Sequence, residues 1–310
     1  MQTWRGTEDV PPGWGRCVVT IGVFDGVHRG HQLLVGRAVE RARTLGVPCV
    51  VLTFDPHPSE VLRPGSHPAV LTSAATKAER LAALGVDVVC TLPFTLELSA
   101  LTAEEFAQQV LVDGLHAQVV LVGSNFRYGN RAAGDGQVLT EAGARLGFEV
   151  EVAALHGEGK RTWSSTYIRE RVEVGDVEAA RDALGQEHRV DGVVVTGDQR
   201  GRELGYPTAN LEPVRWSAIP ADGVYAGRLL LDGNALTAAI SIGTNPTFDG
   251  VDRRVEAYVL DFSGDLYSQQ VALTFTAFLR ATLAFDGVEP LVAQMARDVQ
   301  RTRELVDPIG

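Results

Sequence analysis

Cysteine is scarce in this sequence, and the few cysteines are scattered. Cys17, Cys49 and Cys90 are the only three among 310 residues, and no two of them form a CxxC pair. An odd and widely spaced set excludes a disulfide framework and a cysteine-rich zinc site. We therefore expect a protein of the reducing cytoplasm.

Long apolar runs are also missing. Residues 1–15 are polar and contain Pro and Gly, and no later stretch is apolar throughout. A secretory signal needs an apolar centre, and a membrane-spanning helix needs about 20 mainly apolar residues. We expect neither secretion nor membrane insertion.

Lysine is nearly absent as well. Lys77 and Lys160 are the two lysines among 28 basic residues, a preference for arginine that we attribute to genomic base composition. The formal net charge is −11, and an acidic chain is a poor general binder of nucleic acids or anionic membranes. No basic segment of the helix-turn-helix type is evident. Small polyanions such as ATP are still accepted by backbone amides and local arginines.

The first half of the chain alternates strand-like and helix-like segments. Their predicted order is strand 18–23, helix 31–45, strand 49–54, helix 74–84, strand 86–92, helix 103–111, strand 118–122 and helix 138–146. This rhythm predicts an α/β domain, a doubly wound parallel sheet with helices on both faces. Ligands of such sheets bind at the carboxyl ends of the strands.

The second half changes to closely spaced strands. They are predicted at 191–196, 224–231, 236–242, 255–260 and 271–278, with a short hairpin loop at 232–234 and a closing helix at 290–305. This pattern indicates an antiparallel β-barrel with a terminal helix. We place the boundary near residues 185–188, which gives domains 1–186 and 187–310.

The most informative segment is Gly22-Val-Phe-Asp-Gly-Val-His-Arg-Gly-His31, after the first predicted strand. His28 and His31 are three residues apart where a helix begins, so both face one side. Helix N-termini offer unpaired N–H groups to phosphate. The residues expected to hold ATP in this segment are Gly22, Phe24, Asp25, Gly26, His28 and His31.

Other interpretations of this segment remain open. It is neither a Walker A loop nor a GxGxxG loop. It is compatible with a glycine-rich turn carrying two surface histidines. It is also compatible with a metal site, although no third ligand other than Asp25 lies nearby in the sequence.

A second segment, residues 163–169, supplies further phosphate ligands. Ser164, Ser165 and Thr166 are suited to cap a helix that begins near Tyr167. Arg169 lies on the same face, and with the hydroxyls it forms a set that binds phosphate by charge-assisted hydrogen bonds. Simple helix capping is the alternative.

Residues after other strands of the first half are candidates for binding an aromatic ligand. Phe54, Phe126 and Tyr128 are suited to stacking, with core packing as the alternative. Asn125 offers a hydrogen bond, and His57, between two prolines, either binds or stiffens its loop.

The second half carries a glycine-rich segment at residues 191–211. The candidate ATP-binding residues are Gly197, Gly201, Arg202, Gly205, Pro207, Thr208 and Asn210. The glycines let backbone amides wrap phosphates, and the oxygens of Thr208 and Asn210 suit Mg²⁺. A glycine-rich turn without ligand is the alternative.

Glu256 is placed by strand period on the polar face of segment 255–260. A carboxylate there is suited to accept a proton from a hydroxyl that attacks a γ-phosphate. In the last helix, Arg297 and Arg301 fit solvated charges on an amphipathic helix.

These segments resemble one family. Gly22–His31 is similar to the GxFDGxHxGH motif of prokaryotic FMN adenylyltransferases, within the HxGH nucleotidyltransferases. Segments 53–58, 122–135 and 163–169 look like later blocks of that family in its order. Segment 197–211 is similar to the GxxxGRxLGxPTANL signature of riboflavin kinases, followed by similar blocks at 241–248 and 255–260. The resemblance to bifunctional riboflavin kinase/FAD synthetases spans about residues 16–305.

The resemblance implies a Rossmann-like nucleotidyltransferase domain, a riboflavin kinase barrel and two activities. Riboflavin would be phosphorylated by MgATP to FMN, and FMN would be adenylylated by a second ATP to FAD. It assigns the catalytic base to Glu256, triphosphate stabilisation to His28 and His31, and Mg²⁺ to Thr208 and Asn210. In relatives the last helix borders the riboflavin site, so the resemblance also implies flavin contact by Arg297 and Arg301. Flavins are then substrates and products. Two positions depart from the family pattern. Leu62 stands where many relatives have an aromatic residue, and Tyr128 stands where Phe is usual.

Two rival functions stay in view. One is a nucleotidyltransferase for another phosphorylated cofactor precursor, which the kinase segment disfavours. The other is a non-enzymatic flavin-binding regulator, which would be expected to lose the His pair or Glu256. An oligomer is compatible with the sequence, which does not decide the oligomeric state.

Overall fold

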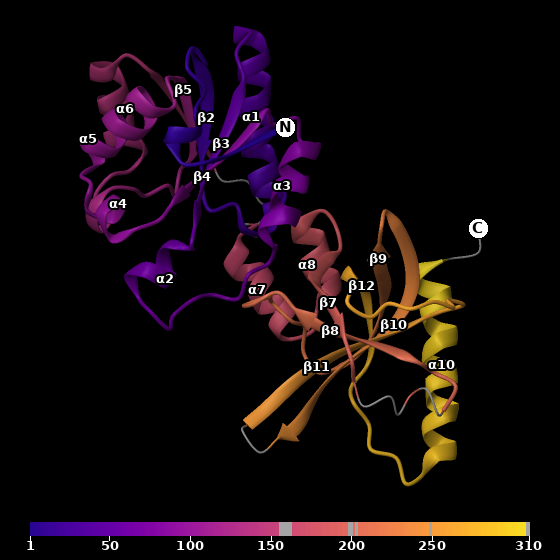
Figure 1. Ribbon diagram of the computed structural model, residues 1–310. Helices are drawn as coiled ribbons and strands as arrows, with labels where there is room; N and C mark the ends of the chain where they lie inside the picture. Colours follow the sequence, from indigo (N-terminus) through magenta and orange to yellow (C-terminus); the bar gives the residue numbers. More distant parts are fainter. Residues whose placement is uncertain (155–162, 198–200, 202–203, 248–249, 308–310) are drawn as a thin grey trace. The chain divides into compact units, whose positions relative to one another are not determined.

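The computed structural model describes residues 1–154, 163–197, 201, 204–247 and 250–307 (Figure 1). Its internal contacts divide the chain into two compact units. The first comprises Met1–Pro68 and Ala74–Trp163, and the second comprises Ala69–Ser73 and Ser164–Gly310. Within the described ranges, no helix is both long and apolar enough to cross a membrane.

The first unit is built on a six-stranded sheet in the order β1-β4-β3-β2-β5-β6. All five strand pairs are parallel. The strands are β1 (Gln2–Arg5), β2 (Cys17–Ile21), β3 (Cys49–Asp55), β4 (Val88–Pro93), β5 (Ala117–Gly123) and β6 (Glu149–Ala153). The chain leaves β2 toward β3 on one side and later returns to β5 on the other, so a topological switch point lies at the carboxyl end of β2.

Helices cover both faces of this sheet, which confirms the predicted α/β architecture. The helices of this unit are α1 (Arg29–Leu45), α2 (Pro58–Leu62), α3 (Ala74–Ala83), α4 (Leu96–Ala100), α5 (Ala103–Phe106) running into the π-helical η3 (Ala107–Gly114), and α6 (Gly136–Leu146). One core contains Val35 of α1 and Leu81 of α3, and the other contains Phe106, Leu111 and Leu139. The central strands are buried on both sides and therefore read as apolar runs.

The second unit is a closed antiparallel barrel in the order β10-β11-β8-β7-β12-β9. Its strands are β7 (His188–Val195), β8 (Thr208–Pro213), β9 (Gly223–Leu231), β10 (Asn234–Thr247), β11 (Gly250–Val259) and β12 (Gln270–Arg280). The barrel, and the terminal helix α10 (Val288–Val306) that contacts β9, β10 and β12, confirm the predicted fold class. Figure 1 shows α10 running along the outside of the barrel.

The turn between β9 and β10 follows from its sequence. Asp232 and Gly233, with φ of 48° and 80°, form the two-residue turn that joins β9 to β10. Such turns need positive φ at both positions, which Asp-Gly accepts.

The second unit also contains two helices that precede the barrel. The helices α7 (Ser165–Glu173) and α8 (Val177–Leu184) pack on each other, and α8 contacts β7 and β12. Val70 in segment Ala69–Ser73 exchanges backbone hydrogen bonds with Trp216 and Ala218.

Candidate functional site

The turn after β2 adopts a conformation that few residues favour. Phe24, Gly26 and Val27 have φ of 51°, 84° and 44°. The Gly22 N–H donates to the Leu52 carbonyl at 3.1 Å, which ties the turn to β3. A Cβ on Gly22 would lie 3.1 Å from the Phe24 ring, so glycine there makes room for that buried ring.

His28 caps helix α1 with its own side chain. The His31 N–H donates to His28 Nδ1 at 3.3 Å, and His28 is 6% exposed. Because Nδ1 accepts this bond, the neutral ring carries its proton on Nε2, which is therefore the donor nitrogen. A Cβ on Gly30 would lie 3.1 Å from His28 Cε1, so the third glycine of the motif leaves space for this ring.

The two imidazoles stack on each other. Their centroids are 3.6 Å apart with an interplanar angle of 21°, and the Phe24 ring meets His31 edge-on at 5.1 Å. Burial, together with the charges of His28 and Lys77, holds the pKa of His31 well below 6.5. His31 is therefore a neutral ring near pH 7. The pair presents directional N–H donors rather than two cations.

All the first-unit residues predicted to hold ATP lie in this turn and the first turn of α1. They are Gly22, Phe24, Asp25, Gly26, His28 and His31. Phe24 and Asp25 are buried at 1% and 5% exposure, so Phe24 supports the rings rather than facing solvent. Sequence reasoning missed Gly30, Lys77 and Arg80, and the last two contact the turn from α3.

The predicted flavin residues leave the same edge of the sheet on strands that flank β2. Phe54 ends β3 and meets Phe94 edge-on at 5.7 Å. His57 caps α2, its Nδ1 accepting the Ser59 N–H at 3.1 Å. Asn125 and Phe126 follow β5, with Asn125 exposed and Phe126 half-buried. These positions surround the carboxyl end of β2, where a ligand is expected.

Tyr128 is a core residue. It is 7% exposed, stacks on Phe126 at 5.2 Å and contacts Phe106 at 5.6 Å. Burial raises the pKa of its hydroxyl to about 12. Leu62, the other departure from the family, is 53% exposed on α2.

The serine block begins a helix in the second unit. Ser164 is the N-cap of α7, and its hydroxyl accepts the Tyr167 N–H at 3.2 Å. Ser165 and Thr166 form the first helical turn, so their backbone N–H groups are among those a helix leaves without internal partners. Arg169 Nε donates to the Ala69 carbonyl at 2.6 Å.

The barrel brings Thr208, Asn210 and Glu256 together on neighbouring strands. Asn210 of β8 lies opposite Glu256 of β11, and the Thr208 hydroxyl donates to Glu256 Oε2 at 3.1 Å. Val255, Ala257 and Val259 are buried while Glu256 is half-buried, as strand period predicts. The site is therefore a row of hard oxygen donors.

Backbone geometry favours glycine at positions 201 and 205 of the barrel segment, and Gly197 faces the side chain of Asn210. A Cβ on Gly197 would overlap the Asn210 amide, and one on Gly201 would overlap the Tyr206 carbonyl. Gly205 has φ of 83° in the turn before Pro207 and β8. Arg202 lies outside the described residues.

The charged residues of α10 separate into two groups. Asp298 is 7% exposed and binds Arg280 of β12 through both carboxylate oxygens, at 2.7–3.0 Å. Arg297 and Arg301 are exposed and bind Gln294 and Glu304 on their own helix. Asp298 is therefore structural, and the two arginines present charge at the surface.

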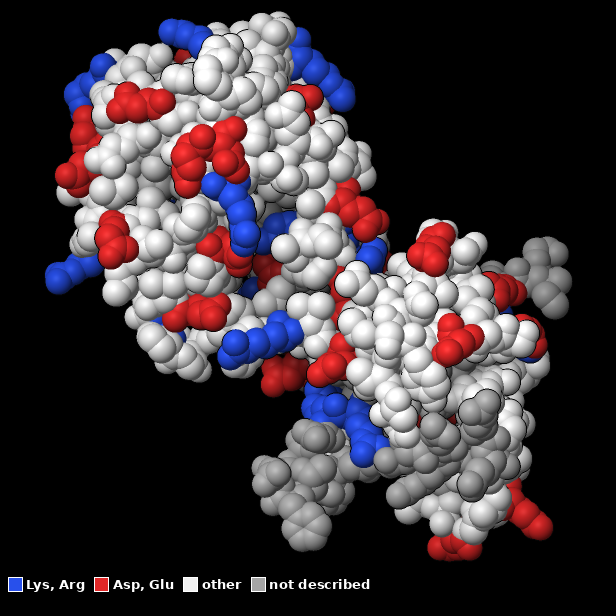
Figure 2. Space-filling view, viewed as in Figure 1, with Lys and Arg blue, Asp and Glu red and all other residues white. Residues whose placement is uncertain are grey.

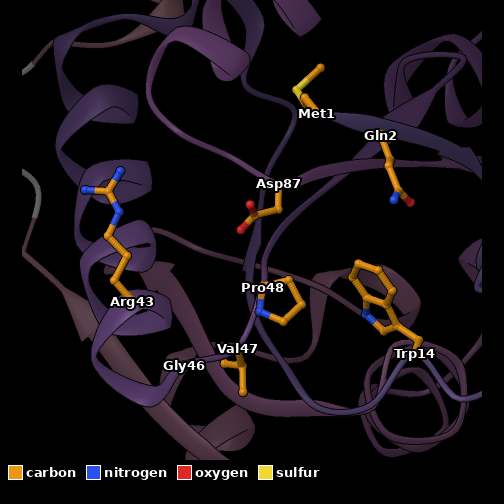
Figure 3. Close-up of a pocket in the computed structure, with 8 residues that line it drawn as sticks. All are labelled: Met1, Gln2, Trp14, Arg43, Gly46, Val47, Pro48 and Asp87. Carbon is orange, nitrogen blue, oxygen red and sulfur yellow. The ribbon is translucent and has the colours of Figure 1, made fainter.

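A hollow at the other end of the sheet is unrelated to these residues. Figure 3 shows its lining, which consists of Met1, Gln2, Trp14, Arg43, Gly46, Val47, Pro48 and Asp87. Pro48 and Asp87 immediately precede β3 and β4, so the hollow lies at the amino ends of the strands. The Asp87 carboxylate there accepts the Cys49 N–H at 2.8 Å and holds the start of β3.

The fold and these two sites define a class of protein. A glycine-rich turn with paired imidazoles at the start of a helix, on the same chain as a barrel with a hydroxyl–carboxylate pair, is typical of transferases of phosphorylated small molecules. Family profiles described as FAD synthetase and riboflavin kinase match residues 11–167 and 184–306. The chain belongs to the bifunctional riboflavin kinase/FMN adenylyltransferase family, which confirms the resemblance seen in the sequence.

Individual relatives match over nearly the whole chain. A bifunctional riboflavin kinase/FMN adenylyltransferase of Pseudomonas fluorescens is 39% identical over 310 residues. The match covers 99% of this chain and 99% of that protein. That of Escherichia coli (strain K12) is 37% identical, covering 93% of this chain and 92% of its own.

A crystal structure titled macrolide-efflux protein from Streptococcus pneumoniae has a TM-score of 0.88 at 32% identity. The match covers 97% of this chain and 98% of that chain. Its title names another function for that protein, whereas the family assignment rests on the two profiles and the curated relatives.

Proposed function

We propose that this chain makes FAD from riboflavin in two steps. Residues 187–310 phosphorylate riboflavin with ATP, giving FMN and ADP. Residues 1–186 then transfer AMP from a second ATP to FMN, giving FAD and pyrophosphate. The observation that carries the proposal is the stacked His28–His31 pair at the start of α1, on a chain that also has the Thr208–Glu256 pair.

In adenylyl transfer, an FMN phosphate oxygen attacks the α-phosphorus of ATP and the bond to pyrophosphate breaks. Charge shifts onto the leaving pyrophosphate, and the chain needs only to position the reactants and stabilise that charge. His28 Nε2 and His31 would donate to the triphosphate, beside the N–H groups of α1. Ser164, Ser165, Thr166 and Arg169 are proposed as further phosphate ligands.

The remaining first-unit residues would shape the ligand site. Gly22, Asp25 and Gly26 form the turn that carries the imidazoles, with Phe24 supporting them. Phe54, His57, Asn125 and Phe126 are proposed to contact the flavin. Tyr128, buried as it is, would act by fixing Phe126.

In phosphorylation, the riboflavin 5′-hydroxyl attacks the γ-phosphorus of ATP and ADP leaves. Glu256 would accept the hydroxyl proton, and the Thr208 hydroxyl orients its carboxylate. The backbone at Gly197, Gly201 and Gly205, with Arg202 and Pro207, is proposed to enclose the phosphates. Arg297 and Arg301 are proposed to contact the flavin from α10.

The oxygen donors of the barrel fit Mg²⁺. The Thr208 hydroxyl and the Asn210 amide oxygen are hard ligands, and they lie beside a carboxylate, as Mg²⁺ sites require. When bound with ATP, the ion would neutralise phosphate charge. We propose Thr208 and Asn210 as its protein ligands.

The setting we propose is the cytoplasm, where ATP, riboflavin and FMN are available. Acidic and basic side chains are interspersed on the visible surface in Figure 2, which together with the net charge of −11 supports small-molecule partners over nucleic acid or membrane. A nucleotidyltransferase for another cofactor precursor would need no riboflavin kinase half, and the match over residues 184–306 disfavours it.

The direct test incubates the purified chain with riboflavin, ATP and Mg²⁺ and separates the flavins by chromatography. We expect FMN first and FAD later. Formation of neither flavin refutes the proposal, and FMN without FAD leaves only the kinase half standing.

A further inference from the structure

Two cations of helix α3 hold the turn that carries the paired imidazoles. Lys77 Nζ donates to the Val23 carbonyl at 2.8 Å, and Arg80 Nη1 donates to the Gly26 carbonyl at 3.0 Å. Both side chains come from a helix that lies some fifty residues further along the chain, and neither belongs to a motif that the proposed function uses.

The carbonyl oxygens of this turn are engaged by donors from several elements. Val23 accepts from Thr53 Oγ1 at 3.1 Å as well as from Lys77, so both of its lone-pair positions are used. The Val27 carbonyl accepts from Gln32 Nε2 at 2.8 Å. Free carbonyl oxygens would repel a polyphosphate. With them engaged, the N–H groups at the start of α1 are what an anion meets.

The turn needs such external support. Val27 is β-branched and has φ of 44°, a conformation that is rare and strained for such a residue, and Phe24 is also left-handed. Strained conformations persist only where surrounding contacts determine them. His28 follows Val27 directly, so any relaxation of the turn would displace the imidazole that caps α1.

The charge of Lys77 is balanced locally. Burial lowers the pKa of its ammonium, whereas the carboxylates of Asp25 and Asp55 raise it. The same ammonium acts with burial and His28 to lower the pKa of His31. Lys77 therefore influences the position of the turn and the protonation of His31.

The residue type is also informative. Lys77 is one of two lysines among 28 basic residues in a chain that otherwise uses arginine. An ammonium on a slender stem reaches a buried carbonyl, which the wider guanidinium reaches less easily.

We infer that Lys77 is a positioning residue for adenylyl transfer, which fixes the Phe24–Val27 turn through the Val23 carbonyl and so places His28 and His31 against the triphosphate of ATP. This inference rests on the proposed function of the same site. It concerns geometry, because Lys77 reaches the turn and not the reacting atoms.

The test compares Lys77→Met, Lys77→Arg and the control Glu79→Gln, an exposed position of the same helix. Adenylylation is assayed with FMN, ATP and Mg²⁺, and riboflavin phosphorylation is assayed in the same preparations as a measure of intact protein. We expect Lys77→Met to lower kcat for FAD formation about 10²-fold, the usual effect of misplacing groups by about 1 Å, with KM for FMN unchanged. Lys77→Arg keeps the charge and can donate, but its head is wider, so it should recover only part of the loss. Glu79→Gln should behave as wild type.

A titration of the histidine NMR signals adds a readout that a loss of folded protein would not move. The pKa of His31 should rise in Lys77→Met, because the neighbouring positive charge is gone, and should stay low in Lys77→Arg. If Lys77→Met does not fold, Thr53→Val replaces it, since it removes the other donor on the same oxygen. Thr53→Val should also lower kcat for FAD formation, but by less than Lys77→Met is expected to.

The inference is wrong if Lys77→Met, or Thr53→Val in its place, forms FAD with wild-type kcat. It is also wrong if a folded Lys77→Met loses both activities in parallel, or if Lys77→Arg is no better than Lys77→Met. Wild-type protein that forms no FAD from FMN would instead refute the proposed function.

Discussion

At the scale of single residues, the His28–His31 pair combines two tasks. The His28 ring caps the helix with Nδ1, which makes Nε2 the donor nitrogen of the neutral ring. The stacked and buried His31 is held neutral. The spacing of the two histidines thus serves local folding together with the proposed phosphate binding, which accounts for a histidine cap in place of the usual Ser or Asp.

Neutral His31 makes the folded state sensitive to acid. Its pKa is well below the unfolded value of about 6.5, so the unfolded chain binds the proton more readily. Stability is fully present above pH 6.5 and is lost as the pH falls from there toward the folded pKa. The loss is at most about 1.4 kcal/mol per pH unit. Urea unfolding of wild type and His31→Gln between pH 5 and 7.5 measures it.

The variant should lose part of this pH dependence, because Gln does not titrate. Equal slopes for the two proteins below pH 6.5 would show that His31 is not held neutral by the fold.

Some residue roles were predictable and others were not. The motif itself indicated His28 and His31, since two histidines and three glycines in ten residues have few structural uses. Lys77 and Arg80 gave no such signal, because their contacts depend on how α3 packs beside β2. Asp298 looked like one of several helix charges, and only the packing of α10 on β12 separates it from Arg297.

At the scale of elements, helix α1 carries two glycines with different surroundings. A Cβ on Gly30 would press on His28, whereas one on Gly36 meets nothing within 4 Å. Gly36→Ala should stabilise the chain by about 1 kcal/mol, the helix preference for Ala over Gly, with both activities unchanged. Gly30→Ala should lower FAD formation at least tenfold and leave phosphorylation intact. Denaturant unfolding and the two assays test this, and equal behaviour of the two variants would contradict it.

Helix α10 is fastened to the barrel by Arg280 and Asp298. Their side chains are 18% and 9% exposed. Asp298→Ala leaves a largely buried guanidinium unpaired and should cost about 3 kcal/mol in the free energy of unfolding, the lower end for a buried pair. Glu304→Ala, which breaks the exposed pair with Arg301, is the matched control and should change stability little. If Asp298→Ala changes the free energy of unfolding in urea as little as Glu304→Ala does, the Arg280–Asp298 pair does not hold α10 on the barrel.

The predicted elements were those with strong apolar patterns. Strands β2 to β5 and helix α1 announced themselves by buried runs and helical spacing. The edge strands β1 and β6 were missed, because Gln2–Arg5 is short and polar and Glu149–Ala153 alternates with charges. Strand β8 was hidden within the glycine-rich segment, since pairing with β7 and β11 decides its conformation more than local preference does.

At the scale of the whole molecule, two units each bury their own core. The helices α7 and α8 and the segment Ala69–Ser73 belong to the same contact unit as the barrel. By contrast, the FAD synthetase profile ends at residue 167 and the riboflavin kinase profile begins at residue 184. The contact units and the proposed catalytic domains, 1–186 and 187–310, are thus drawn on different criteria. The spacing of strands and helices in the sequence shows where the parallel sheet gives way to antiparallel strands. It does not show against which unit a connecting helix packs.

The central claim is that one chain carries two separate transfer sites, and paired variants test it most directly. His28→Ala and Glu256→Ala are each supplied with riboflavin, ATP and Mg²⁺, and separately with FMN, ATP and Mg²⁺, and the flavins are separated over time. The account predicts that His28→Ala accumulates FMN without FAD, while Glu256→Ala leaves riboflavin unchanged and still converts FMN to FAD. Loss of both activities in either variant would contradict two independent sites.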